Sequence, residues 1–548
     1  MPKETGNRPQ HQQHKMAPSL LFIPSEILHL ILRELRRSSL SSFGQTCKAA
    51  EAFVEPLLYR SVLLRFNDKD SQRILPNHAI HSFFRAIRQR PVRASYVETA
   101  KLLSGTSRWG WGDLPNFPAP PDVKPLWLEA LQGDGIQQQR VQEAEMLTLC
   151  AEIDVGSPGA LVAILLASLP QLETLVTDVS MLEQLDRTLG DVFEGLRKLK
   201  KLTIRNNLDS RILNLDIRGE GWGVSSLPRL EHLSTVFQRE DDTSVAHANL
   251  PALRTLKLTD HLSDPSAIRE LLTKTPKLER FSYFLVEDTD DLAADEHYEA
   301  VHQDEWSAFA TSLGSVAETL RILKISTDEA ATEDYPPDTM DEEWMMGISA
   351  RRGIIGSLTH LQNLTKLEIP MHILLGCHPH RTNLRDTLPP GLRKLYLRDD
   401  LVYGDDWGTY VPEVLISALK SYLLEHGSGD EGLSLQELRV KLRDARPMDI
   451  FGRKEIQSGQ GLDERHPLEQ LAGASRQAGV RCTIHFRDLK KTFVSTKDEC
   501  IDRVDELVLY DPNTANPGGG PEDTVMGTAR YPTRRRRLKR ARCFQSNV

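Results

Sequence analysis

The sequence predicts an α/β fold, in which a small all-helical module precedes a curved solenoid built on a parallel sheet, with disordered termini. Three observations support this prediction: a short leucine pattern that recurs along most of the chain, helical runs between its occurrences, and an apolar helical segment near the N-terminus. The chain has 548 residues and 39% of them are apolar, which is enough for a sizeable core with some solvated segments left over.

The leucine pattern consists of a leucine, two residues, an apolar residue, one residue and commonly another apolar residue. Its first position is occupied by Leu172, Leu199, Leu230, Leu253, Leu278, Leu320, Leu364, Leu392 and Leu435. Successive first leucines lie 23 to 44 residues apart, and the shorter intervals match the roughly 20–29 residues of a leucine-rich repeat. We therefore expect an irregular leucine-rich-repeat solenoid over residues 153–510, with parallel strands on its concave face and helices on its convex face.

Segments between the expected strands predict helices or insertions. Helices are predicted to begin at Ser157-Pro158 and Asp264-Pro265, and Val411 to Leu424 is an amphipathic run. Two long intervals contain acidic stretches, residues 287–305 with nine acids and residues 328–343 with eight, and neither holds a Lys or Arg. Like charges at this density repel, so we expect exposed insertions, although a basic target segment could also bind there.

The N-terminal part predicts a disordered leader at residues 1–19 and a helical module at residues 20–62. Ser25 is the predicted N-cap of the first helix, and the apolar residues after it recur at helical spacing. A second short helix follows, and a third is predicted from near Thr46 to Pro56, because proline ends a helix. About forty residues approach the lower limit for an independent core, so we expect the module to complete its packing on another surface.

The same residues resemble an F-box. The resemblance is carried by the order and spacing of Ile23-Pro24-x-Glu26-Ile27-Leu28, Ile31, Leu35, Leu40, Thr46-Cys47-Lys48 and the closing Pro56-Leu57-Leu58-Tyr59-Arg60-Ser61-Val62. It covers about 8% of the chain and implies docking onto the Skp-type adaptor of a cullin–RING ubiquitin ligase. The adaptor-binding residues that it implies are Pro24, Ile27, Leu28, Ile31, Leu35, Leu40 and Phe43. A plain helical cap on the following domain is the other interpretation of these leucines.

The resemblance to an F-box, together with the repeats, implies a substrate-recognition subunit of a Skp–cullin–F-box type E3 ubiquitin ligase. Such a subunit binds the adaptor, and through it the cullin, and it holds a target protein whose identity the sequence does not give. It is not an enzyme, because it only raises the effective concentration of the target near the ubiquitin-loaded enzyme. Two alternatives stay open: a scaffold that binds the adaptor without ubiquitylating a target, and a nuclear factor whose basic tail contacts nucleic acid.

The C-terminal tail, residues 511–548, is predicted to be disordered and basic. From Arg530 onward it holds eight basic residues and no acid, so residues 1–529 carry a net charge of −17, against −9 for the whole chain. A cluster typical of a nuclear-import signal or an anionic-surface contact is formed by Arg534, Arg535, Arg536, Arg537, Lys539 and Arg540. A solvated terminus without a partner is the alternative. Because the rest of the chain is acidic, nucleic acid is an unfavourable partner. We expect an intracellular protein of the nucleus, the cytoplasm or both.

The sequence has no motif typical of a catalytic or cofactor-binding site. No phosphate-binding loop, dinucleotide-binding glycine pattern or nucleophile elbow occurs, so we expect no cofactor. Cys377, His378 and His380 form a small group of potential ligands, but no second group at zinc-site spacing follows, and a surface loop is the better interpretation. No apolar run approaches the roughly 18 residues that cross a bilayer, so no membrane partner is expected. Residues 63–152 are predicted to be a linker and cap with a Trp- and Pro-rich loop.

Overall fold

The chain forms two compact units, Met1–Leu208 and Asp209–Val548. The computed structural model describes residues 23–66, 77–103, 118–132, 143–178, 196–205, 227–237, 249–260, 265–288, 305–330, 354–376, 383–398, 412–427, 434–443, 467–487 and 504–510. Both units have the same α/β construction, in which mostly parallel strands follow one another in chain order and helices lie between many of them.

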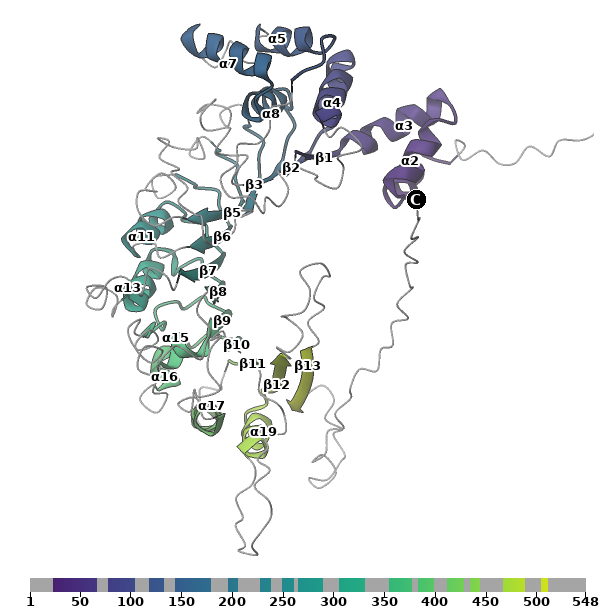
Figure 1. Ribbon diagram of the computed structural model, residues 1–548. Helices are drawn as coiled ribbons and strands as arrows, with labels where there is room; N and C mark the ends of the chain where they lie inside the picture. The colour runs from purple at the N-terminus through teal and green to yellow at the C-terminus, as the bar shows by residue number, and fades with distance from the viewer. Residues whose placement is uncertain are drawn as a thin grey trace, which may run out of the picture. The chain divides into compact units, whose positions relative to one another are not determined.

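Unit 1 begins with three helices, α1 (Ser25–Arg33), α2 (Arg37–Gly44) and α3 (Lys48–Tyr59), which we call the helical head (Figure 1). Strand β1 (Ser61–Arg65) follows after a single residue. The remaining elements are α4 (Asn77–Gln89), the 3₁₀ helix η3 (Pro91–Tyr96), β2 (Thr99–Leu103), α5 (Lys124–Gln132), α7 (Glu143–Val155), α8 (Pro158–Ala167), β3 (Thr174–Asp178) and β4 (Lys201–Arg205). The four strands pair in parallel in the order β1-β2-β3-β4.

Unit 2 has the same construction, with strands of five to nine residues. Its elements are β5 (His232–Phe237), β6 (Thr255–Asp260), α11 (Pro265–Thr273), β7 (Arg280–Asp288), α13 (Glu305–Ser312), the 3₁₀ helix η8 (Leu313–Val316), β8 (Ile322–Ala330), β9 (Lys366–Pro370), α15 (Met371–Leu375), α16 (Leu384–Thr387), β10 (Lys394–Arg398), α17 (Pro412–Gly427), β11 (Glu437–Arg443), α19 (Pro467–Ala478), β12 (Arg481–Arg487) and β13 (Val504–Tyr510). Strands β5 to β12 are parallel, and β13 pairs with β12 in the antiparallel sense. Helices α11 to α17 lie on one side of these strands, and the sheet does not close into a barrel (Figure 1).

The leucine pattern is explained by the register of the strands. In unit 2 the fourth position of the pattern pairs from strand to strand along Leu233, Leu256, Phe281, Leu323, Leu367, Leu395, Leu438 and Cys482. Each of these side chains is at most 2% exposed, and the first leucines of the pattern are also buried. Because side chains alternate across a strand, this ladder places all of them on the helix-covered face and leaves the alternate residues on the other face.

The entry to each strand is held by a shared backbone acceptor. The carbonyl of Glu279 accepts hydrogen bonds from the amides of Arg321 and Ile322, at 2.9 and 3.0 Å. The Arg321 carbonyl accepts from Thr365 and Lys366 in the same way, at 2.9 and 3.1 Å. Neighbouring units therefore begin their strands in step, which keeps the leucine ladder in register however long the intervening segment is.

The predicted helices after Ser157, Asp264 and Val411 are confirmed as α8, α11 and α17. Two predictions in the helical head are wrong. Ser25 is the first residue of α1, and Pro24 precedes it as an N-cap without a side-chain hydrogen bond. Pro56 does not end α3, because Leu57 and Leu58 pack against the core of the head and hold the last turn in place.

Several predicted segments fall partly or wholly outside the described residues. Only the ends of the two acidic stretches lie within the described residues. Glu287 and Asp288 are the last residues of β7, Glu305 is the first residue of α13, and residues 328–330 are the last residues of β8. These ends are regular structure, because the backbone pairing of β7 with β8 continues to Asp288 and Ala330. The leader, the Trp-rich part of the loop after β2, the Cys377 group and the basic tail lie outside the described residues.

Candidate functional site: a protein-docking surface on the helical head

The helical head has a core of its own. One or two side chains from each helix form it, namely Leu28 and Leu32 from α1, Leu40 from α2 and Val54 from α3, each at most 6% exposed. Five partly buried residues surround this core: Ile23, Phe43, Phe53, Leu57 and Leu58. The head therefore closes around a small apolar centre without using all of its apolar residues.

The apolar residues that the core leaves over lie together on α1 and just beyond its end. Ile27, Leu30 and Ile31 are 48%, 58% and 43% exposed, and Leu35 is 39% exposed. The spacing of three and four residues places Ile27, Leu30 and Ile31 along one face of α1, and Leu35 follows two residues after its end. We call these four side chains the apolar stripe. These four are half of the eight large apolar side chains that are exposed in the described residues. Such a concentration of exposed apolar side chains is typical of interaction surfaces.

The structure divides the seven residues that the resemblance implies for adaptor binding. Pro24, Ile27, Ile31 and Leu35 are exposed, and they lie at or beside the apolar stripe. Leu28 and Leu40 lie in the core of the head instead, and Phe43 packs half-buried against that core. Sequence reasoning missed Leu30, although it lies three residues after Ile27 and so shares its helix face.

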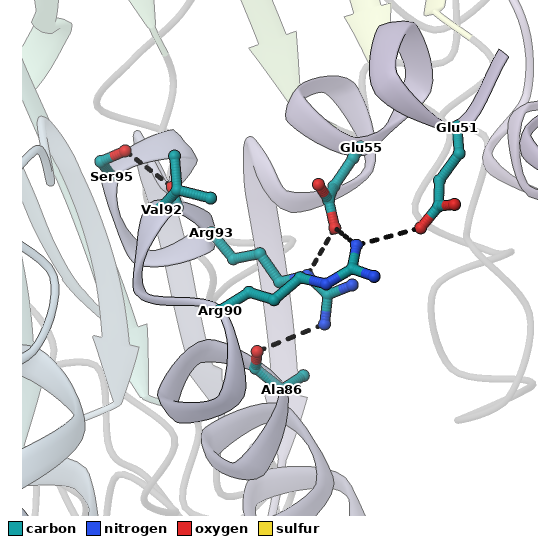
Figure 2. Close-up of polar contacts among 7 residues, drawn as sticks. All are labelled: Glu51, Glu55, Ala86, Arg90, Val92, Arg93 and Ser95. Atoms are coloured by element: carbon teal, nitrogen blue, oxygen red, sulfur yellow. Dashed lines mark hydrogen bonds and ion pairs between the residues drawn. The ribbon is translucent and has the colours of Figure 1, made fainter. Parts of the chain in front are cut away.

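The head is joined to the next helices by an ionic network, which we call the joint. Figure 2 shows Arg90, at the end of α4, between Glu51 and Glu55 of α3, with both nitrogen–oxygen distances at 3.1 Å. Arg93 reaches the same Glu55 carboxylate at 2.6 Å and donates a second hydrogen bond to the Ala86 carbonyl at 3.3 Å. A single carboxylate thus ties α3 to two positions beyond it.

The centre of the joint is shielded from water, whereas its rim is exposed. The side chains of Glu55 and Arg93 are 15% and 16% exposed, and those of Arg90 and Glu51 are 52% and 47% exposed. Burial opposes the ionisation of Glu55, but its hydrogen bonds and attraction to Arg93 and Arg90 hold the pKa of its carboxyl below the ordinary value of 4.5. Glu55 therefore remains charged throughout the neutral range.

Aromatic and backbone contacts reinforce the joint. The Arg93 guanidinium lies over the Tyr59 ring at 5.0 Å, and this ring stacks on Phe83 of α4 at 6.1 Å. The Arg60 carbonyl, between α3 and β1, accepts hydrogen bonds from the amides of Glu98 and Thr99, both at 3.0 Å. Because α3 passes into β1 through one residue, the head is attached to the strands of unit 1 without a flexible linker.

Other kinds of site are not indicated in the part of the chain that the structure describes. No group of three or more His, Cys, Asp or Glu side chains that could hold a metal ion occurs among the described residues. Within the same residues, no single helix has the length and apolar character needed to cross a membrane, and one helix pair bent by 114°, Thr148–Val155 with Pro158–Ala167, meets these criteria only when taken together.

In comparisons with known proteins, no family model and no curated protein matches the chain.

Proposed function

We propose that the chain is the substrate-recognition subunit of a Skp–cullin–F-box type ubiquitin ligase, with the helical head as its F-box and the strand array as a leucine-rich-repeat solenoid. The observation that carries this proposal is the apolar stripe on α1, Ile27, Leu30, Ile31 and Leu35. It lies on the helix to which the resemblance assigns adaptor contact, above a core that is already closed without it.

The size of the stripe fits an interface with a partner. Covering a half-exposed leucine or isoleucine removes apolar surface worth about 1 kcal/mol from water. Four such side chains, with Pro24 at one end, supply the apolar centre that a protein interface of standard size requires. A plain helical cap on the next domain would bury these residues in its own chain, but the described residues leave them exposed.

In this proposal the chain acts by position and has no catalytic role. The adaptor holds the head, the joint fixes the head to the first strands of unit 1, and the array presents the target to the ubiquitin-loaded enzyme. A stiff connection favours transfer, because it restricts the target to fewer orientations than a flexible tether would allow. The short passage from α3 to β1 and the partly buried Glu55–Arg93 pair supply such stiffness.

The test compares two isoleucines of almost equal exposure, Ile31 in the stripe at 43% and Ile354 in unit 2 at 42%. Ile31→Asp is expected to weaken binding of the purified chain to the Skp-type adaptor by about 30-fold, which corresponds to the roughly 2 kcal/mol of an interface hot spot. Ile354→Asp is expected to leave this affinity within about threefold. Isothermal titration calorimetry measures both.

Equal adaptor affinity for the two variants would remove the apolar stripe from the proposal. A second measurement separates a ligase subunit from a scaffold. A ligase subunit retains cullin together with the adaptor when it is purified from cells. Deleting its gene must also cause a target protein to accumulate in a form that carries less ubiquitin. Retention of the adaptor without either result would favour the scaffold.

A further inference from the structure

A cluster of charged side chains lies on the strand face of unit 2 opposite the leucine ladder. Strands β8 to β11 contribute Lys324, Lys366, Glu368, Lys394, Tyr396, Arg398, Glu437 and Arg439, which we call the basic face. Register places Glu368 beside Tyr396 and Tyr396 beside Arg439 on successive strands. These residues alternate with the buried ladder leucines, so they lie on the side that the helices do not cover (Figure 1).

The basic face has more cations than its carboxylates can neutralise. Glu368 is shared by Lys324 at 2.9 Å, Arg398 at 3.2 Å and Lys366 at 4.0 Å. Glu437 is paired with Lys394 at 3.0 Å and also accepts a hydrogen bond from Arg439 Nε at 2.6 Å. Among the described residues of the basic face, two carboxylates thus serve five cations, so cations outnumber the carboxylates that face them.

The cationic side chains of the basic face are more exposed to solvent than its carboxylates. The side chains of Glu437 and Glu368 are only 9% and 17% exposed, whereas those of Lys394, Arg439 and Lys324 are 47%, 41% and 40% exposed. Burial opposes ionisation of both carboxyls, but the surrounding cations hold the pKa of each below its ordinary value, so both are charged at neutral pH. The face therefore presents a positive layer to solvent over a buried negative one.

Tyr396 stabilises this layer from its centre. Its hydroxyl hydrogen-bonds to Glu437 Oε2 at 3.1 Å, and Lys366 and Arg439 lie over its ring at 4.5 and 4.7 Å from the centroid. Two cations already cover the ring, so it is not offered for stacking on a nucleic-acid base. Its role is to hold lysine and arginine groups at a fixed height above the sheet.

We propose that the basic face binds an acidic, carboxylate-rich peptide segment of the target protein. Charge complementarity is the argument: a surplus of exposed cations on an uncovered sheet face attracts a segment of opposite charge. Lys324, Lys366, Lys394 and Arg439 come from four successive strands and span about 14 Å, the length of about four residues in extended conformation. Nucleic acid is disfavoured as the occupant, because Lys366 and Arg439 already cover the Tyr396 ring on which a base would stack. The inference rests on the proposed function only in naming this segment as part of the target.

The experiment uses the full chain and a fluorescein-labelled peptide of about ten glutamates, followed by fluorescence anisotropy near 0.05 M salt. The wild type is expected to bind the peptide, and the triple variant K324Q, K366Q and K394Q is expected to bind it at least tenfold more weakly. The matched control K200Q, R254Q and K274Q removes three cations that also pair with glutamates, and it is expected to bind as the wild type does.

Three outcomes would overturn the proposal: no binding by the wild type, equal weakening by the control, or tighter binding of single-stranded DNA of the same length at the same salt concentration. Circular dichroism checks that the triple variant is folded, and the single variant K394Q, at the most exposed lysine, gives a smaller loss in the same direction. Adaptor binding is measured on the same samples. Its failure with peptide binding intact refutes the ligase proposal alone, and the reverse result refutes the basic face alone.

Discussion

The helical head exposes Ile27 and Leu30 at 48% and 58%, whereas the basic face exposes the side chains of Lys324 and Lys394 at 40% and 47%. Both surfaces rest on a buried leucine core, so the fold alone does not decide their chemistry. An apolar surface is costly to leave in water and favours a partner that stays bound. A charged surface is stable in water and favours partners that associate fast and exchange.

This contrast agrees with the function that we propose, in which the apolar stripe binds one constant adaptor and the basic face binds targets that are later released. In that proposal, specificity comes from shape at the head and from the pattern of charge at the basic face.

The largest effect is expected from Leu28→Ala in the core of the head. Leu28 is 1% exposed, and a cavity at a buried leucine costs about 2–5 kcal/mol of the free energy of unfolding. Hydrogen exchange of α1 to α3 in the full chain is expected to accelerate, and adaptor binding is expected to be lost because the head opens. The matched control is Leu30→Ala, two residues further on and 58% exposed, with an expected change within about 0.5 kcal/mol. Equal acceleration in both variants would show that Leu28 does not support the core.

An intermediate effect is expected at the joint from Glu55→Gln. Removing this charge leaves Arg93 without its carboxylate and is expected to cost about 1–2 kcal/mol in the stability of α3 against α4. The control Glu98→Gln removes the exposed partner of Arg60, where both side chains are more than 40% exposed, and is expected to cost less than about 0.5 kcal/mol. Hydrogen exchange of α3 measures both variants, and an equal response would contradict a special role for Glu55.

The same carboxyl predicts how the joint depends on pH. The pKa of Glu55 is lower in the folded chain than its ordinary value of 4.5, so its stabilising contribution is complete above pH 4.5 and is lost as the pH falls through the lower native pKa. In the Glu55→Gln variant, the stability of α3 measured by hydrogen exchange is expected to lose this dependence on acid pH. An unchanged acid profile would assign the loss to another group.

The smallest change is expected in the response of adaptor binding to salt. Between about 0.05 M and about 0.5 M salt, affinity for the adaptor is expected to change less than threefold, because the apolar stripe carries no charge. Over the same range the acidic peptide is expected to bind the basic face at least tenfold more weakly. Calorimetry measures the salt dependence of adaptor affinity, and anisotropy measures that of peptide affinity. An equal salt dependence of the two affinities would contradict the distinction between the two surfaces.

Much of the array was predictable because its pattern is local. The leucine at the first and fourth positions of each unit predicts a strand, and each of these side chains is buried in the strands that the structure describes. Pro158 and Pro265, each preceded by a residue of a type that favours the N-cap position, predict the starts of two helices. These predictions also depend only on residues that are neighbours in sequence. Pro56 contradicts its local rule, because packing by Leu57 and Leu58 outweighs the proline's preference.

By itself the sequence determined the α/β class, the order of parallel strands and the excess of apolar residues in the helical head, since each depends on spacing along the chain. It did not determine which leucines of α1 face inward, because that depends on the angle at which α2 and α3 pack: Leu28 is buried and Leu30 is exposed. The joint and the basic face were likewise decided only by tertiary structure. Glu55 and Arg93 are 38 residues apart, and Tyr396 meets Glu437 only because parallel pairing brings β10 beside β11.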